Sequence, residues 1–173
     1  GQAVAAYRAE SGAAIVMDTR TGEILALADY PTFDANKPAE ADEADLGSRA
    51  MNDTYEPGSV EKVLTASSLI DAGKAYPRQK FKVPGILERQ ARPIGDWFDL
   101  GMIRLTLAGI IAKSSNIGTV LAADAFTTPE LVAYLQKFGL GQRTNIGVRG
   151  ETPGILKSGD VMTSQEKDRV AFG

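Results

Sequence analysis

The stretch 55–62, written YEPGSVEK, constrains this chain more than any other. Pro57 and Gly58 interrupt whatever precedes them, and the apolar pattern that follows is helical, so Ser59 is predicted at or beside a helix N-terminus. Lys62 comes three residues later, which places its ammonium one turn away on the same helical face as the Ser59 hydroxyl. The stretch therefore predicts a turn ahead of a helix, with a serine and a lysine side by side.

A serine hydroxyl needs a base, and the composition limits which base is available. The 173 residues contain no histidine and no cysteine, which excludes a Ser-His-Asp triad, a thiol nucleophile and zinc sites with thiolate or imidazole ligands. A lysine can serve if burial lowers its pKa, because desolvation disfavours the charged ammonium. We therefore predict that Lys62 activates Ser59 for acyl transfer. The alternative interpretation is an N-cap serine with a snorkelling lysine nearby.

A second polar cluster, Ser114-Ser115-Asn116, lies between two apolar segments, 105–112 and 117–125, that are predicted as buried helices. A hydroxyl at this break can relay a proton between Lys62 and a leaving group, and an Asn carboxamide can both donate to and accept from a peptide-like substrate. The alternative is that the Ser and the Asn simply cap the following helix.

The chain contains a second Ser-x-x-Lys, at Ser164 and Lys167. It stands in a polar stretch without an apolar helix behind it, so nothing there is expected to bury the lysine or to lower its pKa. We predict that this copy lies at the surface and takes no part in catalysis.

The first part of the chain predicts a β-hairpin followed by a surface segment. Residues 13–18 and 23–29 have the composition of strands, and the residues 19–22 between them, TRTG, have that of a tight turn. We expect at least one face of this hairpin to be covered. Residues 31–53 are polar and rich in Asp and Glu, which is typical of a solvated excursion.

Beyond the hairpin the pattern is mainly helical. We predict a helix at 60–72, ended by Gly73, and an amphipathic helix at 129–138. The proline-containing residues 74–99 are predicted as loops with at most one short strand. Since no repeat, low-complexity tract or linker interrupts the pattern, a single domain is predicted for 1–173.

The charge pattern argues against two classes of partner. The formal net charge is -3 and no basic stripe with interleaved aromatic residues is present, so nucleic acid is not expected. No apolar run approaches the roughly 18 to 20 residues that a membrane-spanning helix needs.

YEPGSVEK followed by KSSNIG resembles the penicillin-binding protein family, and more specifically the transpeptidase domain of a class B penicillin-binding protein. The resemblance runs over nearly the whole chain. Its other phrases are AAIVMDTRTGEILALADYPTFDAN at 13–36, SRAMNDTYEPGS at 48–59, LTLAGIIAKSSNIG at 105–118, FGLGQRTNIGVRGETPG at 138–154, and the final AFG.

The resemblance implies a fold and a set of roles. The fold is α/β, or α+β: a penicillin-binding, serine β-lactamase-like transpeptidase fold with an antiparallel sheet and a helical subdomain. Ser59 would be the acylated nucleophile and Lys62 its base, Ser114 the hydroxyl that relays a proton, and Asn116 the group that holds the substrate amide and contacts Lys62. Ser59, Ser114 and Asn116 would bind the substrate, and the backbone N–H of Ser59 would be half of the oxyanion hole. No metal or organic cofactor is implied.

The family also has a third motif, Lys-Thr-Gly or Lys-Ser-Gly, on a core strand. Lys157-Ser158-Gly159 has the same letters but stands earlier than the family's motif and has no β-rich run behind it. We expect Lys157 in a loop, and the third motif and the later strands beyond the truncated C-terminal end of this chain. One departure is Glu61, where the family often carries an aromatic or other bulky residue. A carboxylate near Lys62 would oppose the lowering of its pKa unless Glu61 points away.

The reaction implied is the cross-linking of peptidoglycan: Ser59 is acylated by a D-Ala-D-Ala stem peptide, and β-lactam antibiotics acylate the same serine. The parent protein would lie outside the bacterial cytoplasmic membrane, anchored by an N-terminal transmembrane helix absent from this chain. Other domains would bind divisome or elongasome proteins.

Two alternatives remain open, and the 173-residue piece itself could be inactive. A serine β-lactamase-like hydrolase would share the nucleophile but needs a group that activates water, and no Glu-x-x-Leu-Asn is present. A penicillin-recognising scaffold or receptor without catalysis would keep the fold alone.

Overall fold

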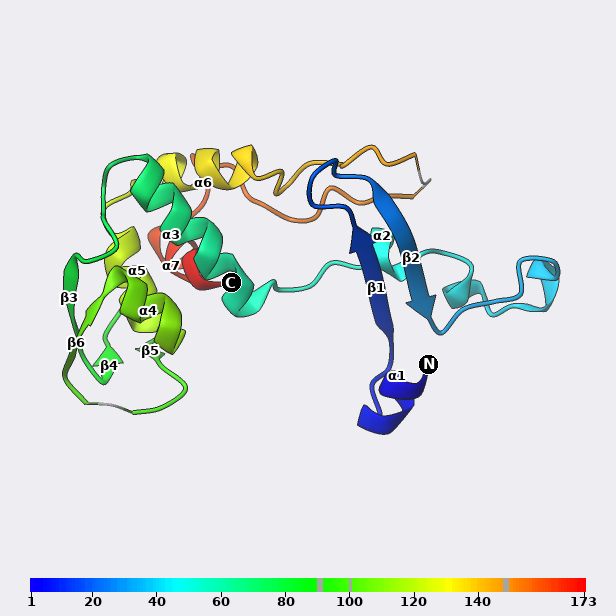
Figure 1. Ribbon diagram of the computed structural model, residues 1–173, viewed down its shortest axis with the longest axis horizontal. Coiled ribbons are helices and arrows are strands. Elements are labelled where there is room, and N and C mark those ends of the chain that lie inside the picture. The colour runs from blue at the N-terminus through cyan, green and yellow to red at the C-terminus, as the bar shows by residue number, and fades with distance from the viewer. Residues whose placement is uncertain (90–91, 100, 148–149) are drawn as a thin grey trace. The chain divides into compact units, whose positions relative to one another are not determined.

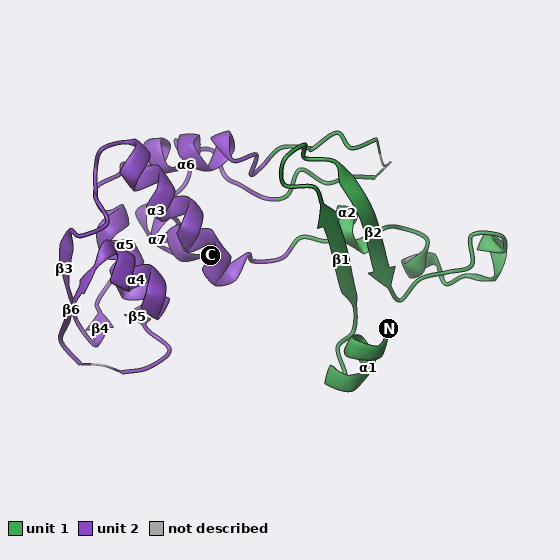
Figure 2. Ribbon diagram, in the orientation of Figure 1, with its two compact units in different colours: residues 1–54, 142–154 green, residues 55–141, 155–173 purple. Residues whose placement is uncertain are grey.

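The computed structural model describes residues 1–89, 92–99, 101–147 and 150–173 (Figure 1). They fold as two compact units, residues 1–54 with 142–154 and residues 55–141 with 155–173 (Figure 2). The units alternate along the sequence, so the chain passes from one to the other three times. A division into compact units does not decide how many domains a chain forms, and the single domain predicted for 1–173 stays a prediction.

The first unit is built on the predicted hairpin. Helix α1 (Gln2–Tyr7) precedes strands β1 (Gly12–Met17) and β2 (Ile24–Tyr30), which pair antiparallel with one register shift between Val16 and Met17. The turn between the strands is tied by the Asp18 carboxylate, which accepts hydrogen bonds from the backbone N–H groups of Arg20 and Thr21 at 2.8 and 3.2 Å. The hairpin prediction is confirmed.

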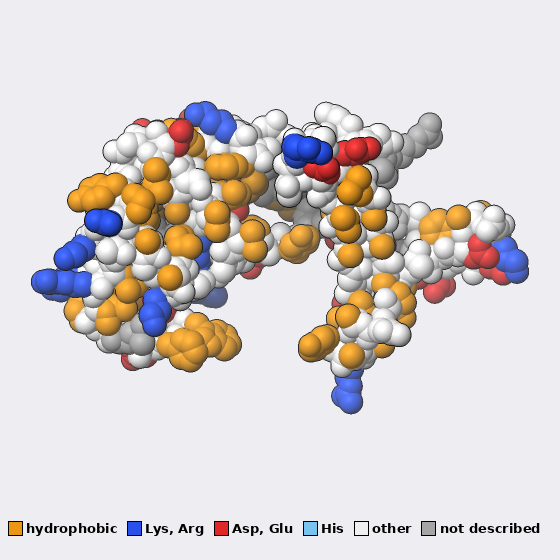
Figure 3. All heavy atoms as spheres, in the orientation of Figure 1, with side chains coloured by type: hydrophobic (Ala, Val, Ile, Leu, Met, Phe, Trp, Pro, Cys, Tyr) orange, Lys and Arg blue, Asp and Glu red, His pale blue; other side chains and the backbone are white. Residues whose placement is uncertain are grey.

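The expectation of a covered face is met only in part among the described residues, where the short helix α2 (Arg49–Asn52) packs against both strands of the hairpin. Successive residues of a strand point to opposite faces, yet the neighbours Ile15 and Val16 are 51% and 54% exposed and Leu25 is 60% exposed. Apolar side chains gather along the hairpin in the space-filling view (Figure 3). The hairpin thus offers apolar surface on both faces.

The acidic segment after the hairpin has more structure than a solvated excursion. It forms the 3₁₀ turns η1 (Pro38–Glu40) and η2 (Glu43–Asp45) and the short helix α2 (Arg49–Asn52). Asp29 of β2 anchors the start of α2, because its carboxylate accepts from Ser48 Oγ at 2.6 Å and from the backbone N–H of Ala50 at 2.8 Å.

The second unit contains the helical core. Its helical elements are η3 (Gly58–Val60), α3 (Glu61–Asp71), α4 (Leu107–Lys113), α5 (Asn116–Ala123), α6 (Thr128–Lys137) and α7 (Ser164–Phe172). Its strands are β3 (Lys80–Val83), β4 (Ile86–Leu87), β5 (Ile94–Gly95) and β6 (Ile103–Thr106). β3 pairs with β6 and β4 with β5, both antiparallel.

Helix α5 lies between two apolar clusters. Its residues Ile117 and Val120 pack with Val83 and Ile94 from the short strands. Its residues Ala122 and Ala123 belong to the larger cluster, together with Ala66, Leu69, Ala75, Leu107, Phe126, Leu131, Leu135 and Ala171. A helix that is apolar on most sides is stable only when it is buried. The predicted Ser114-Ser115-Asn116 cluster at the start of α5 is therefore held firmly in the unit.

Two sequence predictions fail where strands form. The helix expected at 105–112 begins only at Leu107, because Leu105 pairs with Phe81 of β3 and the Thr106 side chain caps the helix by accepting from Gly109 N–H at 3.0 Å. Residues 74–99 contain three short strands where at most one was expected. The partners of these strands lie far away in sequence or are only two residues long, so no local periodicity reveals them.

None of the helices among the described residues is both long and apolar enough to cross a membrane.

Candidate active site

Ser59 lies where the sequence places it, in a turn directly ahead of a helix. Gly58 has a φ of 61°, a conformation that glycine adopts without the steric cost of a Cβ atom. The 3₁₀ turn η3 then carries Ser59 and runs into α3, and no side chain caps this helix start. The Ser59 hydroxyl is thus exposed and is not used as a cap, so the N-cap interpretation is wrong.

Lys62 joins the two predicted serines. Its Nζ donates to Ser59 Oγ at 3.0 Å, to Ser114 Oγ at 3.0 Å and to the Ser114 carbonyl oxygen at 2.7 Å. Ser114 Oγ in turn donates to Ser59 Oγ at 2.9 Å. The three side chains close a triangle of hydrogen bonds between the start of α3 and the end of α4.

The backbone of Ser114 makes this triangle possible. Ser114 ends α4 in the left-handed region, with φ 53° and ψ 40°, which is uncommon for a residue with a Cβ atom and costs on the order of 1 kcal/mol. In this conformation its carbonyl oxygen and its hydroxyl both face the Lys62 amine. Strained residues of this kind concentrate at functional sites.

The carbonyl oxygen decides where a neutral Lys62 presents its lone pair. A charged ammonium donates three hydrogen bonds, and the three acceptors just described use them all. After the loss of one proton the amine keeps two N–H groups and one lone pair. Since a carbonyl oxygen only accepts, it retains one N–H, and the lone pair therefore faces one of the two hydroxyls. Neutral Lys62 is arranged to take a proton from a serine.

Burial makes that neutral form accessible. The Lys62 side chain is only 2% exposed, and burial lowers its pKa, while the negative charge of Asp96 acts in the opposite direction and more weakly. This direction agrees with the prediction from the sequence. Helix α3, which carries Lys62, packs against α4, α5, α6 and α7.

The other two residues of the polar cluster have different surroundings. Ser115 caps α5 by accepting from Gly118 N–H at 2.8 Å, and it donates to the Asp96 carboxylate at 2.6 Å. Asn116 is half-buried, and its Nδ2 donates to the Gly95 carbonyl oxygen at 3.0 Å. In the described part of the chain, the hydrogen bonds of Lys62 Nζ go to Ser59 and Ser114, so a direct contact from Asn116 to Lys62 stays a prediction.

Asp96 is the residue that the sequence reasoning missed. It lies just after β5, a strand that was itself not predicted, and it meets Ser115 only through the fold. A single aspartate between loop residues carries no local signal that could have identified it.

Glu61 is not among the charges that act on the pKa of Lys62, although it is buried in the same unit. Its side chain is 2% exposed, and burial raises its pKa to about 7. One carboxylate oxygen has no hydrogen-bond partner among the described residues. The expected electrostatic conflict with Lys62 is replaced by a cost of burying Glu61 itself.

The lysine of the second Ser-x-x-Lys is not at the surface, which corrects that part of the prediction. Ser164 is exposed, but α7 packs on α3, α5 and α6, and Lys167 is only 8% exposed. Its Nζ donates to the Phe126 carbonyl oxygen at 2.7 Å, an acceptor with no proton to give. Lys157 lies outside the helices and strands, as expected, and pairs with Glu166.

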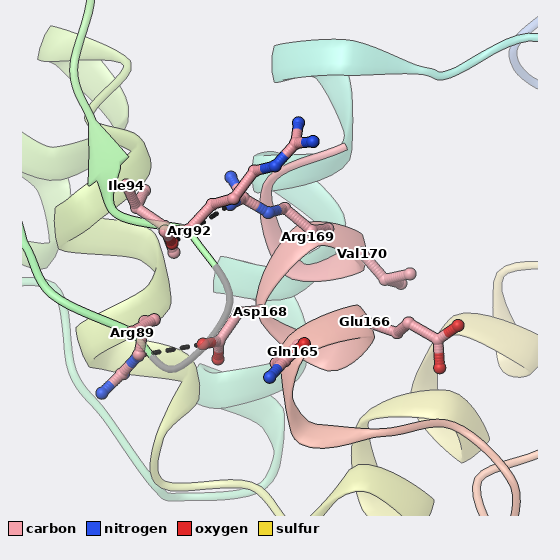
Figure 4. A pocket seen from close by; sticks show the side chains of 8 residues that line it. All are labelled: Arg89, Arg92, Ile94, Gln165, Glu166, Asp168, Arg169 and Val170. Atoms are coloured by element: carbon pink, nitrogen blue, oxygen red, sulfur yellow. Dashed lines mark hydrogen bonds and ion pairs between the residues drawn. The ribbon is translucent and has the colours of Figure 1, made fainter.

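A cavity of about 320 Å³ lies elsewhere in the same unit (Figure 4). It is bounded by α7, by residues of the β4–β5 connection and by β5. Its lining residues are Arg89, Arg92, Ile94, Gln165, Glu166, Asp168, Arg169 and Val170. Arg89 pairs with Asp168 across it at 2.9 Å. None of the triangle residues lines this cavity.

Comparison with known proteins agrees over nearly the whole chain. The family model described as the penicillin binding protein transpeptidase domain matches residues 12–173. Penicillin-binding protein PbpB of Mycolicibacterium smegmatis is 34% identical over 167 residues, which cover 95% of this chain and 26% of that protein. The probable peptidoglycan D,D-transpeptidase PenA of Neisseria flavescens is 36% identical over 172 residues, which cover 99% of this chain and 42% of that protein.

Solved structures agree as well. Penicillin-binding protein 3 from Mycobacterium tuberculosis, complexed with aztreonam, has a TM-score of 0.90 and 33% identity, and the match covers 99% of this chain and 39% of that one. The chain spans less than half the length of these relatives.

Proposed function

Because this chain belongs to the penicillin-binding protein transpeptidase family, we propose that it supplies the nucleophile, the base and the proton relay of a peptidoglycan D,D-transpeptidase. The observation that carries the proposal is the triangle of Ser59, Lys62 and Ser114, with a lysine pKa lowered by burial. The fold is the family's mixture of helices and antiparallel strands.

In the first half of the proposed reaction a stem peptide acylates Ser59. Neutral Lys62 takes the Ser59 proton as Oγ bonds to the carbonyl carbon of the penultimate D-Ala. The C–N bond to the terminal D-Ala then breaks. Its nitrogen leaves as an amine after it receives the proton from Lys62 through the Ser114 hydroxyl, which lies 3.0 Å from the lysine.

In the second half of the reaction the same groups transfer protons in the opposite direction. An amino group of a neighbouring stem attacks the ester, and Lys62 accepts the proton that this nitrogen loses. The ester C–O bond breaks, Ser59 Oγ recovers a proton, and a new amide bond links the two stems. The Asn116 amide would orient the donor peptide by hydrogen bonds to its backbone.

Stabilisation of the tetrahedral oxyanion needs donors in addition to the base. We assign one donor to the backbone N–H of Ser59 at the α3 start. A second donor and a carboxylate-binding group would come from strands outside this chain, and the exposed apolar faces of the β1–β2 hairpin fit pairing and packing with such strands. Lys157 is placed in a loop and is not assigned this role.

The proposed site of action is the outer face of the bacterial cytoplasmic membrane, where stem peptides are cross-linked. Ligands of this site would be stem peptides and the β-lactams that imitate them. Divisome or elongasome proteins would bind through segments other than the site described above.

Intact-mass measurement after incubation with benzylpenicillin tests the proposal. A β-lactam ring opens on acylation without a leaving group, so the full-length protein that carries this sequence should gain the whole mass of one penicillin. Ser59→Ala should gain none. The matched control is Ser164→Ala in the second Ser-x-x-Lys, which should be labelled like the wild type.

An adduct that survives Ser59→Ala, or no adduct on a folded wild-type protein, would overturn the assignment. The lifetime of the adduct separates the transpeptidase from a hydrolase: slow decay supports the proposal, and turnover within seconds contradicts it.

A further inference from the structure

A single carboxylate links β5 to the turn that carries Ser114 and Asn116. Asp96 follows β5 directly, and its Oδ2 accepts from Ser115 Oγ at 2.6 Å while its Oδ1 accepts from the Ile117 backbone N–H at 3.0 Å. Both oxygens are thus committed to the first residues of α5. The contact at 2.6 Å has the short length of a hydrogen bond to a charged acceptor.

The strand before Asp96 is itself held in the core. Ile94 is 1% exposed and packs with Ile117 and Val120 of α5. Gly95 pairs with Ile86 of β4, and its carbonyl oxygen accepts from Asn116 Nδ2 at 3.0 Å. Asp96 therefore projects from a fixed point, and its two hydrogen bonds transmit that position to the turn.

Ser115 connects Asp96 to the two neighbouring residues that are proposed to act on the substrate. It stands between Ser114, which bonds to Lys62, and Asn116, which bonds to Gly95. Its own hydroxyl accepts from Gly118 and donates to Asp96, so both its proton and a lone pair are engaged. The left-handed backbone of Ser114 is held on its C-terminal side by these bonds.

Asp96 also acts on Lys62 through its charge. Its carboxylate raises the pKa of the lysine, against the larger lowering that burial produces. A helix cap without this charge would hold the turn equally well but would leave Lys62 a weaker base, because nothing would offset the desolvation of its ammonium.

We propose that Asp96 is a positioning residue of the active site, which holds the Ser114–Asn116 turn against Ser59 and Lys62 and keeps a negative charge beside that turn. The inference rests on the proposed function for its effect on rate. Its effect on Lys62 stands independently, because it concerns one titration in the folded chain.

Four substitutions separate the two parts of the proposal. Asp96→Asn keeps the shape and removes the charge, and Asp96→Glu keeps the charge at a longer reach. Ser115→Ala removes the contact and leaves the charge. Asp99→Asn is the matched control, since Asp99 lies in the same loop and, among the described residues, its carboxylate accepts from the nearby Gly101 N–H at 2.8 Å and not from α5.

The rate of acylation by a fluorescent penicillin is measured against pH in the full-length protein. Asp96→Asn should lower the rate at neutral pH by about 10- to 100-fold: an amide nitrogen cannot accept, so either Ser115 Oγ or the Ile117 N–H loses its acceptor, and misplacement of a catalytic group has effects of this size. It should also move the rising limb of the pH profile to lower pH, because the lysine loses its proton earlier. Ser115→Ala should lower the acylation rate without moving the rising limb of the pH profile. Asp96→Glu should leave the position of that limb unchanged. Asp99→Asn should change neither the rate nor the position of the limb.

The titration of Lys62 is read separately from [13Cε]lysine NMR spectra, assigned with Lys62→Arg. A shift to lower pH in Asp96→Asn and none in Asp99→Asn supports the proposal even if acylation at Ser59 is refuted. A folded Asp96→Asn variant with the wild-type rate, or with a reduced rate and an unmoved Lys62 titration, overturns it. If Asp96→Asn does not fold, the other two variants test the proposal. An acylation rate equal to that of the wild type in Ser115→Ala contradicts it. So does a shift of the rising limb of the pH profile in Asp96→Glu.

Discussion

The two Ser-x-x-Lys copies in this chain share their spacing, a helix and a buried lysine, yet they have different surroundings. Lys62 and Lys167 are 2% and 8% exposed. Lys62 donates to two hydroxyls and a carbonyl, whereas Lys167 donates to the Phe126 carbonyl oxygen. Burial therefore does not separate the lysine proposed as the base from the other lysine. The difference is a hydroxyl partner that can give up a proton.

The starts of α3 and α7 also differ in whether side chains cap them. Thr163 caps α7 in a capping box with Glu166, so the first turn around Ser164 is satisfied by side chains. The start of α3 has no side-chain cap, and Ser59 lies in the turn before it with its hydroxyl directed to Lys62 and Ser114. The α7 start is built for stability and the α3 start leaves its serine available. Four predictions can break or sharpen this comparison.

The largest effect is expected from exchanging each lysine for methionine, which keeps an unbranched side chain, one atom shorter, and removes its base. Lys62→Met should lower the rate of acylation by β-lactams by about 10³-fold, within the usual range for a general base. Lys167→Met should leave that rate within about twofold and instead lower the unfolding free energy by about 1 to 3 kcal/mol, since the buried Phe126 carbonyl loses its donor. Stopped-flow acylation and urea unfolding measure the two effects.

The comparison would break if Lys167→Met abolished acylation in a folded protein. It would also break if Lys62→Met reacted at the wild-type rate.

A smaller effect is expected at the relay. Ser114→Ala removes one of the two hydroxyls at Lys62 but leaves the carbonyl contact of the same residue. We expect acylation to slow by about 10- to 100-fold, since Ser59 still reaches the lysine directly. Ser164→Ala serves as the control. Equal rates for Ser114→Ala and the wild type would remove the relay from the mechanism.

Stability should depend on pH through Glu61, which precedes Lys62 as Glu166 precedes Lys167 but, unlike Glu166, is buried. Burial raises its pKa from 4.5 to about 7, so the folded state binds a proton more tightly than the unfolded state. Glu61 does not reduce the unfolding free energy below about pH 4.5, where it is protonated in both the folded and the unfolded state. The reduction grows as the pH rises to about 7 and is constant above that. The full reduction is on the order of 3 kcal/mol.

Glu61→Gln should therefore be more stable than the wild type at pH 8 and should lose this advantage at pH 4. Urea unfolding of both proteins across this range measures the difference. Parallel stability curves for the two proteins would contradict the raised pKa.

The smallest effect tests the cap of α7. Thr163→Ala should lower the unfolding free energy by about 1 kcal/mol, the usual cost of losing an N-cap, and should leave acylation unchanged. Ser164→Ala, one residue further on, should have almost no effect on either property. Chemical denaturation of the two variants side by side checks this, and a slower acylation in Thr163→Ala would show that the second copy influences the site.

The pairing of Ser59 with Lys62 could be predicted because it is local. Pro57 and Gly58 determine the turn, and helical geometry alone brings residues three apart together. The hairpin and the helices α3, α5 and α6 were also predictable from periodicity and turn residues. Strands β4 and β5 were not, since two-residue strands have no periodicity and form only when a partner is present.

The sequence by itself determined a serine and a lysine on one face of a helix start, and a Ser-Ser-Asn cluster at a break between apolar helices. Tertiary structure alone decided that Ser114 reaches Lys62 with its backbone in a left-handed conformation, that Asp96 holds Ser115, and that α7 buries Lys167. The physical reason is the distance along the sequence between the residues that interact. Spacing along a helix is set by neighbouring backbone angles, whereas contacts between distant segments and the desolvation of a lysine depend on the packing of the whole unit.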